Sequence, residues 1–201
     1  MKISIIPKYN LKTEKEYCCV PAVLQMVQER RGFEFSSQEE IGYQLGLIIP
    51  KEKAHLFSKV RTGRIPKTGW GTQTSKKQYS INNYFVKNNL PLELTIYNVQ
   101  EIKNVSEFVI QNFMNDNDII ICYNSQFLFD DGDIEHVSLI QEIETENDKL
   151  TIIDPAIGVP KLRKTKLTRL IRVLKSHETS MLIGFWIVSR TNNKIEREYE
   201  K

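Results

Sequence analysis

Residues 16–27, EYCCVPAVLQMV, carry a helical pattern that begins at a pair of cysteines. From Val20 onward, apolar residues recur at the spacing of one helix face, which predicts a buried amphipathic helix over 22–29. Pro21 fits only the first turn of such a helix, because no intrahelical bond needs its missing N–H there. We therefore expect Cys19 at or just before the first turn.

A thiol at this place faces the unpaired N–H groups and the positive end of the helix dipole. Both favour the thiolate, which is the reactive form of cysteine. The alternative is that Cys18 and Cys19 are two small core residues, since free cysteine is often simply buried. This stretch alone leaves both interpretations open.

The composition is that of a soluble globular protein, with 40% hydrophobic and 26% charged residues. A length of 201 residues suits one domain with a substantial core, so we expect a single domain over 1–201 with a fraying charged tail at 191–201. The net charge of +3 is too small to indicate nucleic-acid binding. No apolar run approaches the ~18 residues of a membrane span, so no membrane partner is expected.

The three cysteines lack a CxxC spacing and indicate neither a disulfide framework nor a zinc site. We expect no metal and no cofactor. The apolar patch at 3–6 is too short for a signal peptide, so a cytoplasmic location with reduced thiols is expected. The oligomeric state is left open.

Periodicity predicts a largely helical first half and a strand-rich second half, which is an α+β fold. In the first half we expect a strand at 3–6, helices at 37–45, 75–88 and 105–113, and a strand at 92–97. In the second half we expect strands at 118–123, 135–143, 149–154 and 181–189 and a helix at 167–174. The segments 48–74 and 124–133 are rich in turn residues and are predicted to be loops.

The hairpin built from 135–143 and 149–154 places a histidine and an aspartate on one face. A turn of five residues, 144–148, brings even-numbered positions opposite even-numbered positions. Asp154 then lies opposite Ser138 and diagonal to His136, at roughly 7–8 Å between Cα atoms. A four-residue turn would put the two side chains on opposite faces, so the prediction depends on the turn.

An aspartate beside a histidine fixes the tautomer of the ring and stabilises the imidazolium, which keeps a nearby thiol ionised. Cys19, His136 and Asp154 are therefore our candidates for a nucleophile, a general base and acid, and an orienting residue. Taken singly, a histidine on a strand is more often a core residue and an Asp-Pro pair more often a turn. It is the combination of the three that favours catalysis.

Three motifs carry a resemblance to a known family. Residues 19–26, CVPAVLQM, resemble the C-G-P-A-x-L-x-M helix start of the double-glycine, bacteriocin-leader-cleaving peptidases, which are papain-like cysteine peptidases. Residues 135–140, EHVSLI, resemble their G-H-apolar strand, and 153–155, IDP, resemble their apolar-D-P strand end. The resemblance covers most of 11–158. It implies a papain-like fold, with the nucleophile helix packed on a mostly antiparallel sheet, and cleavage of a peptide or protein substrate through an acyl-enzyme.

The chain departs from this family at two positions. Val20 stands where the family has glycine, and Thr13 stands where it carries a glutamine that donates to the oxyanion. Losing one such donor typically costs on the order of a hundredfold in rate. Asn10 or the loop 69–73 are the substitutes we consider for it. The departure leaves open a peptide-binding module with little catalysis, and an acyl or amide transferase would use the same acyl-enzyme.

Loop residues on either side of the site are candidates for substrate binding. Trp70 and Gly71 would form one rim, because glycine lets backbone approach a ligand and tryptophan offers a flat apolar face. Phe129, with Phe127, would form the opposing wall of a groove for an extended peptide. The alternative is that Trp70 plugs the core. The basic stretch 161–175 is interpreted as a solvated helix face.

Overall fold

The computed structural model describes residues 1–132, 134–176 and 182–191. The predicted tail therefore lies outside the described residues from 192 onward, as do Asp133 of the predicted loop and Met181 at the start of the last predicted strand.

The core of the fold is a seven-stranded sheet in which all strand pairings are antiparallel. The strand order is β4-β9-β5-β6-β7-β8, with β1 also paired to β6. The strands are β1 (Lys2–Ser4), β4 (Leu92–Tyr97), β5 (Asp118–Asn124), β6 (Glu135–Glu144), β7 (Lys149–Ile153), β8 (Leu162–Lys166) and β9 (Gly184–Arg190). The unbroken apolar run in β5 is buried along its whole length, as an interior strand requires.

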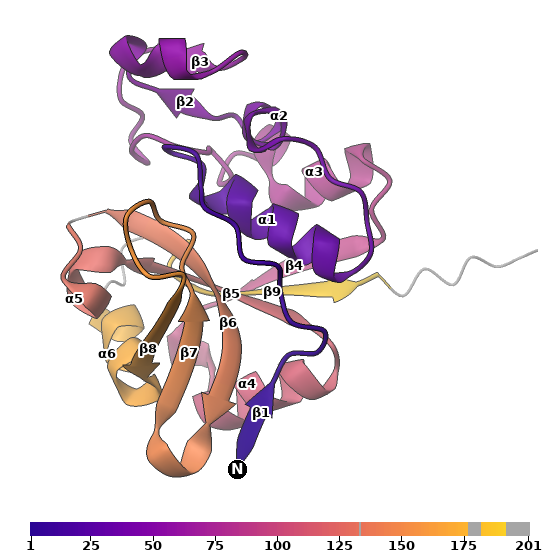
Figure 1. The fold of residues 1–201 in the computed structure, drawn as a ribbon, viewed down its shortest axis with the longest axis vertical. Helices are drawn as coiled ribbons and strands as arrows, with labels where there is room; N and C mark the ends of the chain where they lie inside the picture. Colours follow the sequence, from indigo (N-terminus) through magenta and orange to yellow (C-terminus); the bar gives the residue numbers. More distant parts are fainter. Residues whose placement is uncertain (133, 177–181, 192–201) are drawn as a thin grey trace, which may run out of the picture.

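Helices cover both sides of this sheet. They are α1 (Cys19–Arg30), α2 (Gln38–Gln44), α3 (Ile81–Lys87), α4 (Val105–Met114), α5 (Ser125–Phe129) and α6 (Leu167–Ser176). Figure 1 shows α1, α2 and α3 on one side of β5 and β9, with α4, α5 and α6 on the other. The mixture of helices and an antiparallel sheet confirms the predicted α+β class.

The α1 helix is buried nearly all round. Every residue from Val20 to Gln28 is buried, and α1 packs against β6 in the main core. Cys19 is its first residue, so the predicted place of the thiol is confirmed. The helix begins earlier than the predicted 22–29 because Pro21 occupies its first turn, where a proline does no harm.

Side-chain caps set the beginnings of three further helices. Ser37 accepts from the Glu40 N–H at α2 and Ser80 from the Asn83 N–H at α3. The cap at Ser80 also explains why the predicted helix 75–88 divides into a 3-10 helix, Lys77–Tyr79, and α3. Asn124 caps α5 in the same way by accepting from the Gln126 N–H.

Two predicted loops contain regular structure. The prediction of a loop over 124–133 was wrong at 125–129, where α5 lies. The segment 48–74 contains a parallel pair, β2 (Ile48–Ile49) and β3 (Arg61–Thr62), and a 3-10 helix, Lys51–Leu56. These pieces are short, and proline and glycine dominate the pattern around them, so periodicity did not reveal them.

The basic stretch 161–175 is not one helix face. Its first part is β8, which pairs with β7 and whose side chains alternate between exposed and half-buried. Its second part belongs to α6, which buries Leu167, Leu170, Val173 and Leu174. The strand was missed because neither of its half-buried positions, Arg163 and Thr165, carries an apolar side chain.

The turn between β6 and β7 has four residues, 145–148, and not the predicted five. Glu144 pairs with Lys149, so positions of unlike parity face each other next to the turn. The register then shifts between Ile140 and Glu142, where one extra residue of β6 forms a β-bulge. Beyond the bulge, even positions face even positions again, as the five-residue turn would have given.

A buried charge cluster ties α1 to the start of β5. The Asp118 carboxylate accepts from Arg30 Nε at 2.6 Å, from Arg31 Nε, and from the Tyr9 hydroxyl at 2.7 Å. All three ionised side chains are shielded from solvent. The cluster fixes the far end of α1, and therefore the direction in which the helix presents Cys19.

We predict that Asp118→Asn lowers the free energy of unfolding by about 3–5 kcal/mol, because two buried guanidinium groups lose the counterion that is buried with them. The measurement is urea unfolding followed by circular dichroism. Asp116→Asn is the matched control, since Asp116 also pairs with Arg30 but is exposed, and it should cost at most about 1 kcal/mol. Equal losses in the two variants would contradict a structural role for the buried cluster.

Candidate active site

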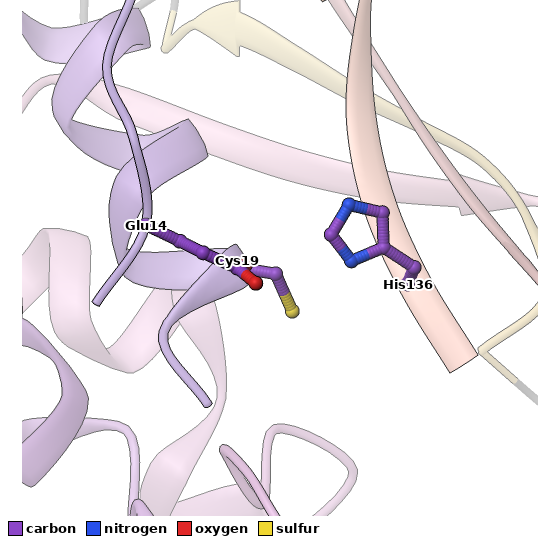
Figure 2. Close-up of side chains that lie close together, drawn as sticks. All are labelled: Glu14, Cys19 and His136. Carbon is purple, nitrogen blue, oxygen red and sulfur yellow. The ribbon is translucent and has the colours of Figure 1, made fainter. Parts of the chain in front are cut away.

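Cys19, His136 and Asp154 come together although they lie on three different elements. The Asp154 Oδ1 atom and the His136 Nε2 atom are 2.8 Å apart, and both residues are buried. The Cys19 Sγ atom, a ring nitrogen of His136 and a carboxylate oxygen of Glu14 all lie within 4.8 Å of one another. Since Asp154 occupies Nε2, the nitrogen facing the thiol is Nδ1, and Figure 2 shows the sulfur pointing toward that side of the ring.

The hairpin register explains the contact between histidine and aspartate. Leu139 pairs with Ile153, so Ser138 is the position opposite Asp154, and His136 is two residues further along the same face. This is the predicted arrangement, reached through a shorter turn and a bulge. Tyr123 pairs with His136 from β5, and its ring meets the imidazole edge-on at 5.9 Å between centroids.

Both carboxylate oxygens of Asp154 are held in place. Oδ1 also accepts from the Ala156 N–H at 2.9 Å, and Oδ2 accepts from Arg163 at 3.1 Å. The Asp154 N–H donates to the Lys161 carbonyl at 2.9 Å. The carboxylate therefore has a fixed orientation toward His136, as an orienting residue needs.

Arg163, which the sequence did not single out, is itself held from two sides. Its guanidinium lies 3.6 Å from the centroid of the Phe129 ring, and it also pairs with Asp131. Phe129 in turn contacts Tyr123 edge-on. Arg163 contacts the Asp154 carboxylate and helps to hold it in place.

The electrostatics favour a charged histidine. Burial opposes the positive charge of His136, but the hydrogen bonds and negative charges of Asp154 and Cys19 outweigh it and raise the pKa of the ring well above its usual range. Burial likewise opposes the charge of Asp154, and His136, the Ala156 N–H and Arg163 lower the pKa of its carboxyl. The arrangement is therefore suited to a thiolate and imidazolium pair next to a carboxylate.

The other two cysteines are unsuited to this chemistry. Burial raises the pKa of Cys18 to about 12, and its side chain packs with Leu47, Ile49 and Phe57. Burial also raises the pKa of Cys122 well above its usual range. Cys19, by contrast, is only partly buried. Of the two adjacent cysteines, Cys18 is a core residue, as the alternative interpretation expected, and Cys19 lies beside His136.

Glu14 is a further member of the site that the sequence analysis missed. It lies on the irregular segment before α1, and Figure 2 shows its carboxylate beside the Cys19 side chain. No periodic pattern marks this segment, and only its position five residues before the cysteine points to it. Carboxylate, thiol and imidazole donors at this spacing are also what metal ions bind. We interpret the cluster as an acid–base site, because Asp154 and Cys19 raise the pKa of His136 and favour the protonated ring, which is not a metal ligand.

The side-chain amides considered as substitutes for the missing glutamine have other partners. The Asn10 amide donates to Glu29, at the other end of α1 from Cys19. The Gln73 amide donates to the Gly69 and Gly71 carbonyls within its own loop. Thr13, in the place of the family's glutamine, is exposed.

The predicted substrate-binding residues lie on the 69–73 loop and in the short helix α5. Gly71 has a φ of +118° and bridges to Ile48, and a Cβ atom there would lie 3.9 Å from the Tyr17 carbonyl oxygen. This loop therefore approaches the segment that leads into Cys19. Trp70 is half-buried and is not part of the described core. Phe129 is half-buried against Arg163 and Tyr123, and Phe127 is exposed.

Comparison with known proteins gives likenesses in structure only. No family model matches the chain, and no curated protein matches it. A double-glycine motif protease from an AMS/PCAT transporter, solved in complex with the leader peptide, is similar at a TM-score of 0.47 and 13% identity, over 95% of this chain and 99% of that one. The peptidase domain of Streptococcus ComA, a bifunctional ABC transporter of a quorum-sensing pathway, is similar at a TM-score of 0.45 and 12% identity, over 92% of this chain and 97% of that one.

Both of these structures are peptidase domains. The roles of individual residues in this chain follow from its own contacts. Of the helices that the structure describes, none has the length and apolar character needed to cross a membrane.

We predict that Asp154→Asn lowers the pKa of His136 by at least about one unit, because burial then acts on the imidazolium without a carboxylate to offset it. The measurement is an NMR titration of the ring with ¹⁵N-labelled histidine. Asp130→Asn is the control, since Asp130 is exposed and its left-handed backbone suits asparagine. An unchanged titration of His136 in Asp154→Asn would contradict the role assigned to the carboxylate.

Proposed function

We propose that this protein is a papain-like cysteine peptidase that cleaves a peptide or a leader sequence through an acyl-enzyme. Cys19 is the nucleophile, His136 the general base and acid, and Asp154 the orienting residue. The observation that carries this proposal is the buried contact between His136 Nε2 and Asp154, with the Cys19 thiol on the other side of the same ring. The motif resemblance at 19–26, 135–140 and 153–155 supports it.

The reaction follows from these contacts. The Cys19 thiolate attacks the carbonyl carbon of the scissile amide, so a C–S bond forms and the carbonyl oxygen becomes an oxyanion. When the intermediate collapses, the C–N bond breaks and the His136 Nδ1–H gives its proton to the leaving amine. Water then attacks the thioester while His136 takes up one of its protons, and the acid product leaves with Cys19 free again.

The substrate would lie between two rims. Trp70 and Gly71 form one, where the loop approaches the segment before Cys19, and Phe129 and Phe127 form the other. A groove between two such rims would suit an extended peptide rather than a compact small molecule.

Selective alkylation tests the nucleophile. We expect iodoacetamide at pH 6 to modify Cys19 at least about tenfold faster than Cys18 or Cys122, because only Cys19 has an imidazolium beside it and the other two thiols are buried with raised pKa values. Peptide mapping by mass spectrometry measures the three rates, and His136→Ala should reduce the advantage. Equal rates for the three cysteines, or no effect of His136→Ala, would refute the assignment.

The peptidase activity is tested on the same samples. Incubation with a pool of synthetic peptides, half of them containing a Gly-Gly pair, should yield new termini by mass spectrometry with the wild type and none with Cys19→Ala. A wild type whose Cys19 is selectively alkylated but which binds peptides without cleaving any would favour the peptide-binding module instead.

Trp70→Ala tests the rim. Because Trp70 is half-buried and outside the described core, we expect a melting temperature close to that of the wild type and a KM for the cleaved peptide raised about tenfold, as for the loss of ~1.4 kcal/mol of binding. Trp186→Ala is the comparison, since Trp186 is buried in the sheet and its loss should cost about 3–5 kcal/mol of stability. A large fall in the melting temperature of Trp70→Ala with an unchanged KM would remove Trp70 from the site.

A further inference from the structure

Glu14 presents an unexplained group at the centre of the site. Its Oε2 atom is shielded from solvent and has no hydrogen-bond partner among the described residues. Its backbone N–H donates to the Pro155 carbonyl at 2.8 Å, which anchors the segment to the corner that follows Asp154. A carboxyl group is thus held beside Cys19 and His136 with its Oε2 atom unpaired, at a place where an unpaired polar atom is costly.

The ionised form of Glu14 is unfavourable at this position. Burial raises the pKa of its carboxyl, and the nearby Asp154 carboxylate raises it further. His136, on β6, and Lys161, before β8, act in the opposite direction and do not reverse the shift. Cys19 at the start of α1 faces it as well, and a thiolate there adds a like charge. The neutral acid, which carries one O–H donor, therefore persists to higher pH than in an ordinary glutamate.

The reaction needs a donor in this region. As the C–S bond forms, negative charge collects on the carbonyl oxygen, next to the sulfur. The Cys19 N–H, at the first turn of α1, is one of the helix N–H groups without an intrahelical acceptor and supplies one donor. A second donor must come from a side chain near the thiol, and the amides of Asn10 and Gln73 are engaged elsewhere.

We propose that Glu14 is a catalytic residue that donates its carboxyl O–H to the oxyanion, together with the Cys19 N–H. The proposal rests on the proposed function, because it assigns a role in the attack by Cys19. The proton stays on Glu14 throughout, so the step is a hydrogen bond and not a proton transfer. A neutral glutamic acid differs from glutamine only in presenting O–H where glutamine presents N–H.

The proposal has a consequence for pH. Below the raised pKa of Glu14 the donor is present, and as the pH rises through that value the donor is lost and a negative charge takes its place. Glutamine at the same position would donate at every pH.

Two thiol reagents separate the oxyanion from the nucleophile. Acylation of Cys19 by p-nitrophenyl acetate passes through an oxyanion. Its rate is measured from the burst of released p-nitrophenolate. Alkylation by iodoacetamide displaces iodide directly and forms no oxyanion. The ratio of the two rates removes effects on thiolate content and isolates stabilisation of the oxyanion. It is measured from pH 5 to 8 for the wild type, Glu14→Gln and Glu14→Ala. Glu16→Gln is the matched control, because Glu16 is a half-exposed carboxylate of the same segment, paired with Lys53.

We expect Glu14→Ala to lower the ratio at pH 5 at least about tenfold, toward the hundredfold typical of a lost oxyanion donor. The wild-type ratio should fall as the pH rises, whereas the Glu14→Gln ratio should stay level and exceed that of the wild type at pH 8. Should Glu14→Ala fail to fold, the proposal is tested by comparing how the ratio depends on pH in the wild type and in Glu14→Gln. Glu16→Gln should behave as the wild type.

A ratio that is unchanged in Glu14→Ala, or a wild-type ratio with the same pH dependence as that of Glu14→Gln, would overturn the role of Glu14 while leaving Cys19 as the nucleophile. Failure of iodoacetamide to select Cys19 in the wild type would instead remove the proposed function, and the role of Glu14 with it.

Discussion

The hydrogen bond between His136 and Asp154 is the contact on which the site depends. It joins β6 to the residue that follows β7, in a buried place where desolvation opposes the charge of the histidine and the carboxylate offsets it. It forms only because the two side chains share a face of the sheet, and a slip of one residue would turn them to opposite faces. The β-bulge in β6 and the fixed environment of Asp154 both serve this single contact.

The pairing of His136 with Asp154 could be predicted from the sequence, but the path of the chain that produces it could not. A five-residue turn was expected, and the actual turn of four residues would by itself have separated the two side chains. The bulge before Glu142 adds the missing residue. Alternation of apolar and polar residues reveals which face a strand buries, but it does not reveal where an extra residue is inserted, because polar and apolar residues both tolerate a bulge.

The residues that surround the triad were harder to predict than the triad itself. Cys19 stands at a helix start and Asp154 before a proline, and both are marked by local rules. Arg163 lies on a strand whose positive charges are typical of a solvated surface. What distinguishes it is its contacts with Asp154 and Phe129, which lie outside that strand. Glu14 lies on an irregular segment, where no period relates one residue to the next. Contacts of this kind are set by tertiary packing alone.

The charges of the site are consistent with a neutral Glu14. In the proposed reactive state, the negative charges of Cys19 and Asp154 lie near the positive charges of His136 and Arg163. Arg163 also pairs with a further carboxylate, that of Asp131. An ionised Glu14 would add a buried negative charge with no hydrogen-bond donor assigned to its Oε2 atom. Proton uptake by Glu14 removes that charge, and the same proton is placed where the oxyanion develops. The burial that makes the glutamate unfavourable as an anion is therefore what makes it useful as an acid.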